Sequence, residues 1–141
     1  MQDSLNLKFQ QLILRFHRLG GELPPLETFN ITPSQVVYLD YLARHPDCRL
    51  SELTEALQYS AASVSAMVSL LNAKGLVEKT QEPFDGRALS LSLTEKGHQA
   101  VSEIEQFRSK RVDLLLKSLN EAEKTSLLSL IDKATSKKEE R

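Results

Sequence analysis

The chain has 141 residues, of which 40% are hydrophobic and 26% are charged, as expected for a folded globular protein of one compact domain with added helices. Lys and Arg (18) nearly balance Asp and Glu (19), and residues 51–97 carry a net charge of −2, so no segment has the basic composition of a strong non-specific nucleic-acid binder. The absence of a long apolar run, of a secretory signal and of a second cysteine beside Cys48 predicts a cytoplasmic protein with no membrane span.

The first predicted helix runs from about Leu5 to Leu19 and ends at a pair of glycines. Apolar residues recur along it at helical spacing, and Leu7 and Leu14 add apolar side chains off that stripe. A surface helix of a monomer rarely has more than one apolar face, so we expect this helix to pack against two surfaces. Residues 22–31, with two consecutive prolines, are expected to form a connector.

Three helices are predicted between residues 32 and 75. Thr32-Pro33-Ser34-Gln35 has the features of a helix start, with a capping residue, a proline at the first helical position and a glutamine to complete the capping box. That helix is expected to end at His45-Pro46-Asp47. A short helix over Glu52–Gln58 and a turn at Tyr59-Ser60 then precede a third helix that ends at Lys74-Gly75 and buries Val64, Met67, Val68 and Leu71.

After Gly75 the apolar period changes from 3.6 to 2. Leu76–Thr80 and Ala88–Leu93 are predicted to form a two-stranded hairpin with residues 81–87 as its tip. A lone hairpin is marginally stable in water, so the leucine face of its second strand is expected to lie on the preceding helices. Thr94 is expected to cap a long helix, and Asn120 with Glu123 to begin a last one.

The order helix, short helix, turn, helix and hairpin is the pattern of a winged helix-turn-helix, whose second helix enters the major groove of DNA. The helix-turn-helix would be Ser51–Lys74 and the wing Leu76–Leu93. Four short motifs accompany this pattern: Leu50-Ser51-Glu52-Leu53, Lys74-Gly75-Leu76-Val77, Asp85-Gly86-Arg87 and Leu93-Thr94-Glu95-Lys96-Gly97. In this order and spacing they resemble the MarR family of bacterial transcription regulators, and the resemblance covers almost the whole chain.

The resemblance implies a mainly α-helical fold with a small β-hairpin wing, in a single domain over residues 1–141. Residues 32–93 would form the winged helix-turn-helix lobe that binds double-stranded DNA, and residues 1–31 and 94–141 would supply the dimerisation helices. The implied function is a homodimeric transcription regulator, most simply a repressor, that reads a pseudo-palindromic operator and is released by a small, often aromatic, ligand. No cofactor is expected.

The resemblance assigns the DNA contacts to the third helix of the lobe and to the wing. In the family the wing Asp and Arg act as a pair, so Asp85 would hold Arg87, whose guanidinium enters the minor groove or contacts phosphate. A solvated turn with an incidental ion pair is the alternative. The outward face of the third helix lacks Arg, Asn and Gln near its start, so readout would rest on hydroxyls, methyl groups and DNA shape. The candidate contacts on this helix are Ser60, Ala62, Ser63, Ser65, Ala66 and Ser69.

Several of these residues have a purely structural alternative. Ser60 and Ser63 either cap the third helix alone or also present hydroxyls to a phosphate. Lys74, Lys79 and Arg49 either contact phosphate or remain solvated surface charges.

Other chemistry-bearing residues give weaker signals. The candidates for a ligand pocket are Phe9, Phe16, Tyr38 and Tyr41, which are otherwise core residues. Cys48 is interpreted as a small, partly buried residue in a turn rather than a redox sensor, with Arg49 expected to lower its pKa slightly. No metal site is predicted, because His17, His45 and His98 are far apart in the sequence and lack the spacing of metal ligands.

Two other functions are alternatives to DNA binding. An enzyme is disfavoured because the sequence has no phosphate-binding glycine loop, no nucleophile elbow and no evident carboxylate pair. A winged-helix dimer that acts as a protein-interaction module or antirepressor is favoured by the net charge of −2 over residues 51–97 and by the alanine-rich face of the third helix.

Overall fold

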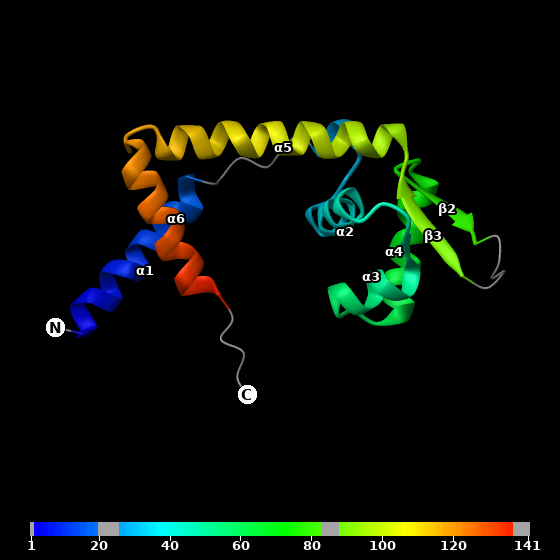
Figure 1. Ribbon diagram of the computed structural model, residues 1–141, viewed down its shortest axis with the longest axis horizontal. Helices are drawn as coiled ribbons and strands as arrows, with labels where there is room; N and C mark the ends of the chain where they lie inside the picture. Colours follow the sequence, from blue (N-terminus) through cyan, green and yellow to red (C-terminus); the bar gives the residue numbers. More distant parts are fainter. Residues whose placement is uncertain (1, 20–25, 83–87, 137–141) are drawn as a thin grey trace. The chain divides into compact units, whose positions relative to one another are not determined.

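The computed structural model describes residues 2–19, 26–82 and 88–136 (Figure 1). The described part of the chain is mainly α-helical with a small β-sheet, as predicted, and none of its helices is long and apolar enough to cross a membrane. In chain order the elements are α1 (Gln2–Leu19), the 3-10 helix η1 (Glu27–Phe29), α2 (Pro33–Arg44), β1 (Cys48–Arg49), α3 (Leu50–Leu57), α4 (Ala61–Ala73), β2 (Val77–Gln81), β3 (Leu89–Leu93), α5 (Glu95–Leu116) and α6 (Glu121–Thr135).

The chain divides into two compact units. One unit comprises Met1–Glu22 and Arg108–Arg141, and the other comprises Leu23–Phe107. The second unit contains η1, α2, α3, α4, the sheet and the first part of α5, and we call it the lobe. The first unit contains α1, the end of α5 and α6, and we call it the terminal unit.

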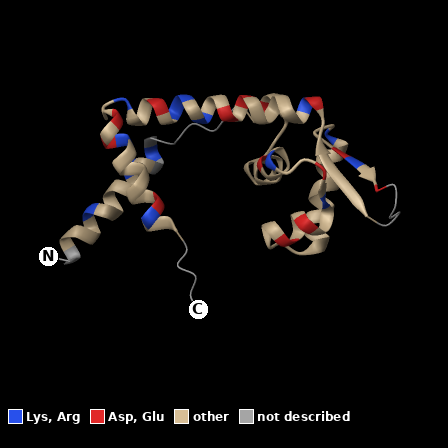
Figure 2. Ribbon diagram, viewed as in Figure 1, with Lys and Arg blue, Asp and Glu red and all other residues tan. Residues whose placement is uncertain are grey.

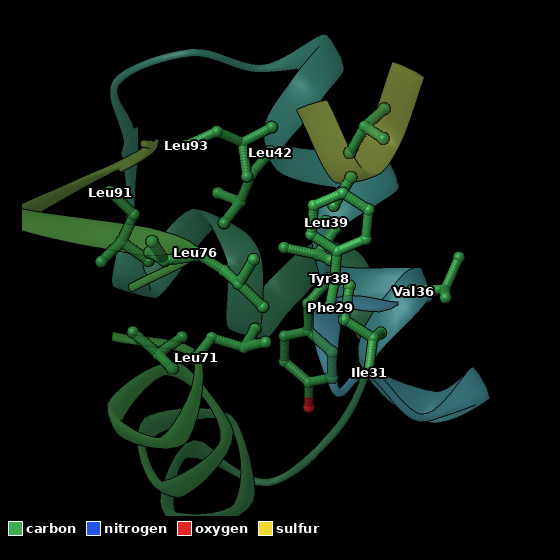
Figure 3. Close-up of a cluster of buried hydrophobic side chains, with 14 of the residues drawn as sticks. Phe29, Ile31, Val36, Tyr38, Leu39, Leu42, Leu71, Leu76, Leu91 and Leu93 are labelled. Carbon is green, nitrogen blue, oxygen red and sulfur yellow. The ribbon is translucent and has the colours of Figure 1, made fainter. Parts of the chain in front are cut away.

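The core of the lobe lies between α2, α4 and β3 (Figure 3). Leu39 from α2 and Leu71 from α4 are fully buried there, together with Leu91 from β3. Leu93 is also buried in this cluster, so the leucine face of the second wing strand packs on the preceding helices as the sequence predicts. This apolar contact is what holds a short sheet that would be unstable by itself.

A buried glutamine joins the start of α2 to the end of α4. The Gln35 side chain accepts a hydrogen bond from the Thr32 backbone N–H (3.1 Å) and another from Lys74 Nζ (3.0 Å). Lys74 also donates to the backbone carbonyl of Asn30. The buried Gln35 side chain therefore has hydrogen-bond partners, and Lys74 Nζ donates to two oxygens of the lobe.

The sheet has three strands rather than the predicted two. They are antiparallel in the order β1-β3-β2, with Cys48 opposite Leu91 and Arg49 opposite Ser90. The expectation that Cys48 lies in a turn is therefore wrong. A strand of two residues is too short to show an alternating pattern, so only its pairing with β3 reveals it.

Burial decides the chemistry of Cys48. Its side chain is only 3% exposed, and its Sγ donates to the Arg49 carbonyl (3.3 Å). Desolvation, and then the nearby charge of Glu52, raise the pKa of the thiol to about 11. The expected lowering by Arg49 is wrong, because the guanidinium lies on the exposed side of the strand, where its Nε is 3.7 Å from a Glu82 carboxylate oxygen.

The start of α5 packs directly on the backbone that follows α4. Thr94 caps α5, as predicted, by accepting a hydrogen bond from the Gly97 N–H (3.1 Å), and its own N–H donates to the Leu76 carbonyl (3.1 Å). A Cβ at position 97 would lie 2.2 Å from that carbonyl oxygen. Only glycine allows this approach, whereas Gly75 is required for its positive φ of 72° and has open space around it.

Alanine substitutions at these two glycines should lower the stability of the protein by different amounts. We expect Gly97→Ala to lower the free energy of unfolding by about 3 kcal/mol or more, because a methyl group is forced against backbone atoms. Gly75→Ala should cost about 1 kcal/mol, the penalty for a left-handed conformation alone. Urea unfolding at one fixed chain concentration measures both, with Ser102→Ala on the exposed side of α5 as the control. Equal losses for the two glycine variants would contradict the close approach.

The environment of Cys48 predicts that its thiol reacts slowly in the folded protein. With the pKa near 11, about one thiol in a thousand is ionised at about pH 8, and the sulfur is also covered by the core. The folded protein should therefore react with a disulfide reagent far more slowly than the same protein in denaturant. Absorbance of the released thiolate follows both reactions. Labelling of the folded protein as fast as that of the denatured chain would show that the thiol is accessible.

Candidate nucleic-acid interface

A short turn joins α3 to α4. Gln58 ends α3 in the left-handed conformation, with a φ of 56°. Ser60 then caps α4, because its Oγ accepts a hydrogen bond from the Ser63 N–H (3.1 Å) and donates to the Ser63 Oγ (2.8 Å). The capping role expected of Ser60 is therefore confirmed, and a contact with phosphate stays a prediction.

The outward face of α4 is exposed and uncharged. Val64, Val68 and Leu71 are buried as the sequence predicts, and Met67 packs against the same core. The segment between Ser60 and Lys74 contains no Lys, Arg, Asp or Glu. The predicted contact residues all lie on the solvent side of the helix or at its start: Ser60, Ala62, Ser63, Ser65, Ala66 and Ser69.

The strand β2 lies beside α4 (Figure 1), and its Lys79 adds a cation to this face. The Asn72 side-chain amide donates to the Val77 carbonyl (2.9 Å), which fixes the start of the strand against the end of the helix. Farther along, Lys79 Nζ donates to the Ser69 Oγ (3.0 Å). The sequence leaves open whether Lys79 contacts phosphate or is a solvated charge, although the strand period of two already places it on the same face as the buried Val77.

The wing pairs β2 with β3 in the register Val77 opposite Leu93 and Gln81 opposite Leu89. The Glu82 N–H also donates to the Ala88 carbonyl (3.0 Å). Asp85 and Arg87, the predicted wing residues, lie outside the described residues, so their pairing and their contact with DNA stay predictions.

The remaining Lys and Arg residues of the described chain are distributed over several elements and interleaved with Asp and Glu (Figure 2). Within the lobe, Lys96 Nζ donates to the Lys74 carbonyl (3.1 Å), and Arg49 lies near Glu82. These cations support local structure, which leaves Lys79 as the one that the described structure joins to the outward face of α4.

Most of the described apolar residues of the terminal unit are exposed. Phe9 on α1 is 56% exposed and Leu128 on α6 is 70% exposed, and no residue of α6 is buried. An open cavity of about 560 Å³ lies along α1, lined by Leu5, Lys8, Phe9, Gln11, Leu12, Arg15 and Arg18. Side chains that a single chain leaves this exposed are typical of a surface that a partner covers.

The predicted ligand residues fall in different units. Phe9 and Phe16 belong to α1 in the terminal unit, where each is about half exposed. Tyr38 is only 4% exposed in the core of the lobe, with its ring centroid 6.2 Å from that of Tyr59. The partly buried Tyr41 stacks on His45, with ring centroids 4.1 Å apart. Each pair is described within its own unit, so a shared pocket stays a prediction.

The structure also allows a search for clusters of metal-binding side chains among the described residues. Within residues 2–19, 26–82 and 88–136, no three His, Cys, Asp or Glu side chains gather in a way that would hold a metal ion.

Comparison with known proteins agrees with this architecture. Residues 29–88 match the model of the MarR family. The chain is 28% identical to the HTH-type transcriptional repressor MdtR of Bacillus subtilis, over 87% of this chain and 78% of that protein. The crystal structure of YusO from Bacillus subtilis has a TM-score of 0.79 and 26% identity, covering 98% of this chain and 99% of that one.

The same fold occurs in a structure solved with DNA. The S. aureus MepR–DNA complex has a TM-score of 0.68 and 24% identity, covering 90% of this chain and 95% of that one. Residues 29–88 match the MarR family, and most of the chain is similar in sequence and fold to transcriptional regulators of that kind.

Proposed function

We propose that the protein is a homodimeric repressor that binds double-stranded DNA at a pseudo-palindromic operator. The observation that carries this proposal is the exposed face of α4 on a winged helix-turn-helix scaffold, with no charge of its own and with Lys79 at its side. The major groove of DNA admits an α-helix, and the second helix of this motif is the one that enters it. MdtR, a similar protein over most of the chain, is named as a repressor.

The chemistry of α4 suggests how the groove is read. Serine hydroxyls bond to base edges or to phosphate, and alanine methyl groups contact the methyl group of thymine. None of these contacts is the bidentate pair that gives the strongest discrimination between bases. Sequence preference would therefore depend on DNA shape, with Arg87 of the wing in a narrow minor groove and Asp85 holding its guanidinium.

The partner that covers the terminal unit is proposed to be a second copy of this chain. Both α1 and α6 expose apolar side chains, so the same surface on two copies supplies both sides of a two-fold interface. The cavity along α1 provides the space that a partner helix would fill. Such a dimer would present two α4 helices to half-sites about one helical turn apart.

A small ligand is proposed to release the DNA. The candidate contacts are Phe9 and Phe16 of the terminal unit with Tyr38 and Tyr41 of the lobe. A ligand that binds one arrangement of these units more tightly than another shifts the dimer toward the arrangement it prefers. MepR, a protein of this fold, is solved in complex with DNA. BpsR of Bordetella bronchiseptica, which shares the fold, is described as regulated in its DNA binding by 6-hydroxynicotinic acid. The absence of catalytic motifs and the relatives named as regulators favour a protein that is not an enzyme.

An interaction module or antirepressor that does not bind DNA is the second candidate. The net charge of −2 over residues 51–97 favours it, because a negative lobe is repelled by the phosphate backbone. The salt dependence of DNA binding separates the two candidates, because only a protein that contacts phosphates loses affinity steeply as salt rises.

The dimer is tested by sedimentation velocity at micromolar concentration. We expect the wild type to sediment as a dimer, and Phe9→Glu to shift it toward the monomer because a buried charge at the interface is strongly unfavourable. Val37→Glu, at an apolar residue of the lobe that is 42% exposed, is the matched control and should remain dimeric. A wild type that sediments as a single chain would refute the dimer.

The wing is tested by the salt dependence of DNA binding. We expect Arg87→Ala to weaken binding to all duplexes and to reduce the slope of log K against log salt by about one, since one phosphate-neutralising cation is lost. The probe is the DNA upstream of the protein's own coding region, measured by a gel-shift titration at several salt concentrations. Arg44→Ala, which removes the same charge from the end of α2, is the control.

The outcomes separate the two candidate functions. Unchanged binding in Arg87→Ala would remove the wing from the mechanism. A wild type that binds neither this probe nor unrelated duplexes, even at low salt, would favour the interaction module.

A further inference from the structure

The helix that faces the DNA in the proposed function has no positive charge of its own. No Lys or Arg occurs between Ala61 and Ala73, and the lysine that follows, Lys74, is bonded to Asn30 and Gln35 at the far end of the helix. A helix placed against phosphates needs a cation nearby, because most of the affinity of proteins for DNA comes from phosphate contacts. That cation must therefore come from another element.

The strand β2 is placed to supply it. The strand runs antiparallel to α4, since Val77 is bonded to Asn72 and Lys79 is bonded to Ser69, one turn nearer the start of the helix. Alternate residues of a strand share a face, so the anchoring of Val77 in the core also directs Lys79 toward the helix. Lys79 and Ser69 are both exposed, so the pair lies on the surface that faces solvent.

We propose that Lys79 is a phosphate-contacting residue of the DNA interface and that Ser69 positions its ammonium at the outward face of α4. This inference rests on the proposed DNA-binding function and names one further residue of that interface. An ammonium has three N–H donors, and one of them is given to the Ser69 Oγ. The Ser69 hydroxyl accepts this bond and keeps its own O–H for a phosphate oxygen, so two elements direct donors to one anion.

A structural role does not account for the pair. A hydrogen bond between two exposed groups exchanges for bonds to water and adds little to stability. Toward DNA the pair has a clear effect, because Lys79 places a positive charge beside the uncharged helix that enters the groove.

The test compares Lys79→Gln with Lys117→Gln, which removes the same charge from the turn after α5 in the terminal unit. The probes are a fluorescein-labelled duplex of roughly 30 base pairs from upstream of the coding region and a scrambled duplex of equal length. Fluorescence anisotropy at several KCl concentrations gives the affinity and its salt slope. We expect Lys79→Gln to lose on the order of tenfold in affinity for both duplexes at low salt, with a slope smaller by about one.

Two further variants assign the roles within the pair. Lys79→Arg should restore both the affinity and the slope, because it keeps the cation. Ser69→Ala should weaken binding by a few-fold and leave the slope unchanged, because it removes a positioning hydroxyl but no charge. Thermal unfolding of Lys79→Gln should match that of the wild type.

The outcomes distinguish this inference from the function on which it rests. If the wild type binds DNA and Lys79→Gln binds it as Lys117→Gln does, the role of Lys79 is overturned and the DNA-binding function stands. A wild type that binds neither duplex would overturn the proposed function and this inference together.

Discussion

The constraint on which the structure depends is the apolar surface that the terminal unit of one chain leaves in water. The side chains of α1 and α6 are spaced as a helix interface requires, yet none of the described ones is buried. Burial of apolar area is the dominant favourable term in protein association, so this surface favours association with a partner. In the proposed dimer, the partner that covers these helices also brings a second lobe to the DNA.

The lobe, in contrast, has a complete core of its own. Leu39, Leu71 and Leu91 join helices and sheet, and the Gln35–Lys74 bond and the Gly97–Leu76 approach fix the ends of its helices. This packing has a functional consequence. It holds β2, which carries Lys79, beside the uncharged helix α4. In the proposed complex α4 would therefore read the shape of the DNA groove, and β2 would contact the phosphate.

The sequence predicts those features whose physical cause is local. Thr32-Pro33 marks the start of α2, Lys74-Gly75 the end of α4 and Thr94 the cap of α5, because each depends on a few adjacent residues. Features that depend on tertiary contacts were missed. The short β1 exists only through its pairing with β3, the raised pKa of Cys48 comes from burial, and the approach of Lys79 to Ser69 needs the packing of β2 on α4.

The central claim is that two joined lobes read DNA as a two-fold pair. Hydroxyl-radical footprinting on the duplex upstream of the coding region tests it most directly, because the footprint reports how many separate contacts one complex makes. The account predicts two protected half-sites related by a dyad, with centres about 10 base pairs apart or a multiple of that distance. A single protected segment without dyad symmetry would contradict it.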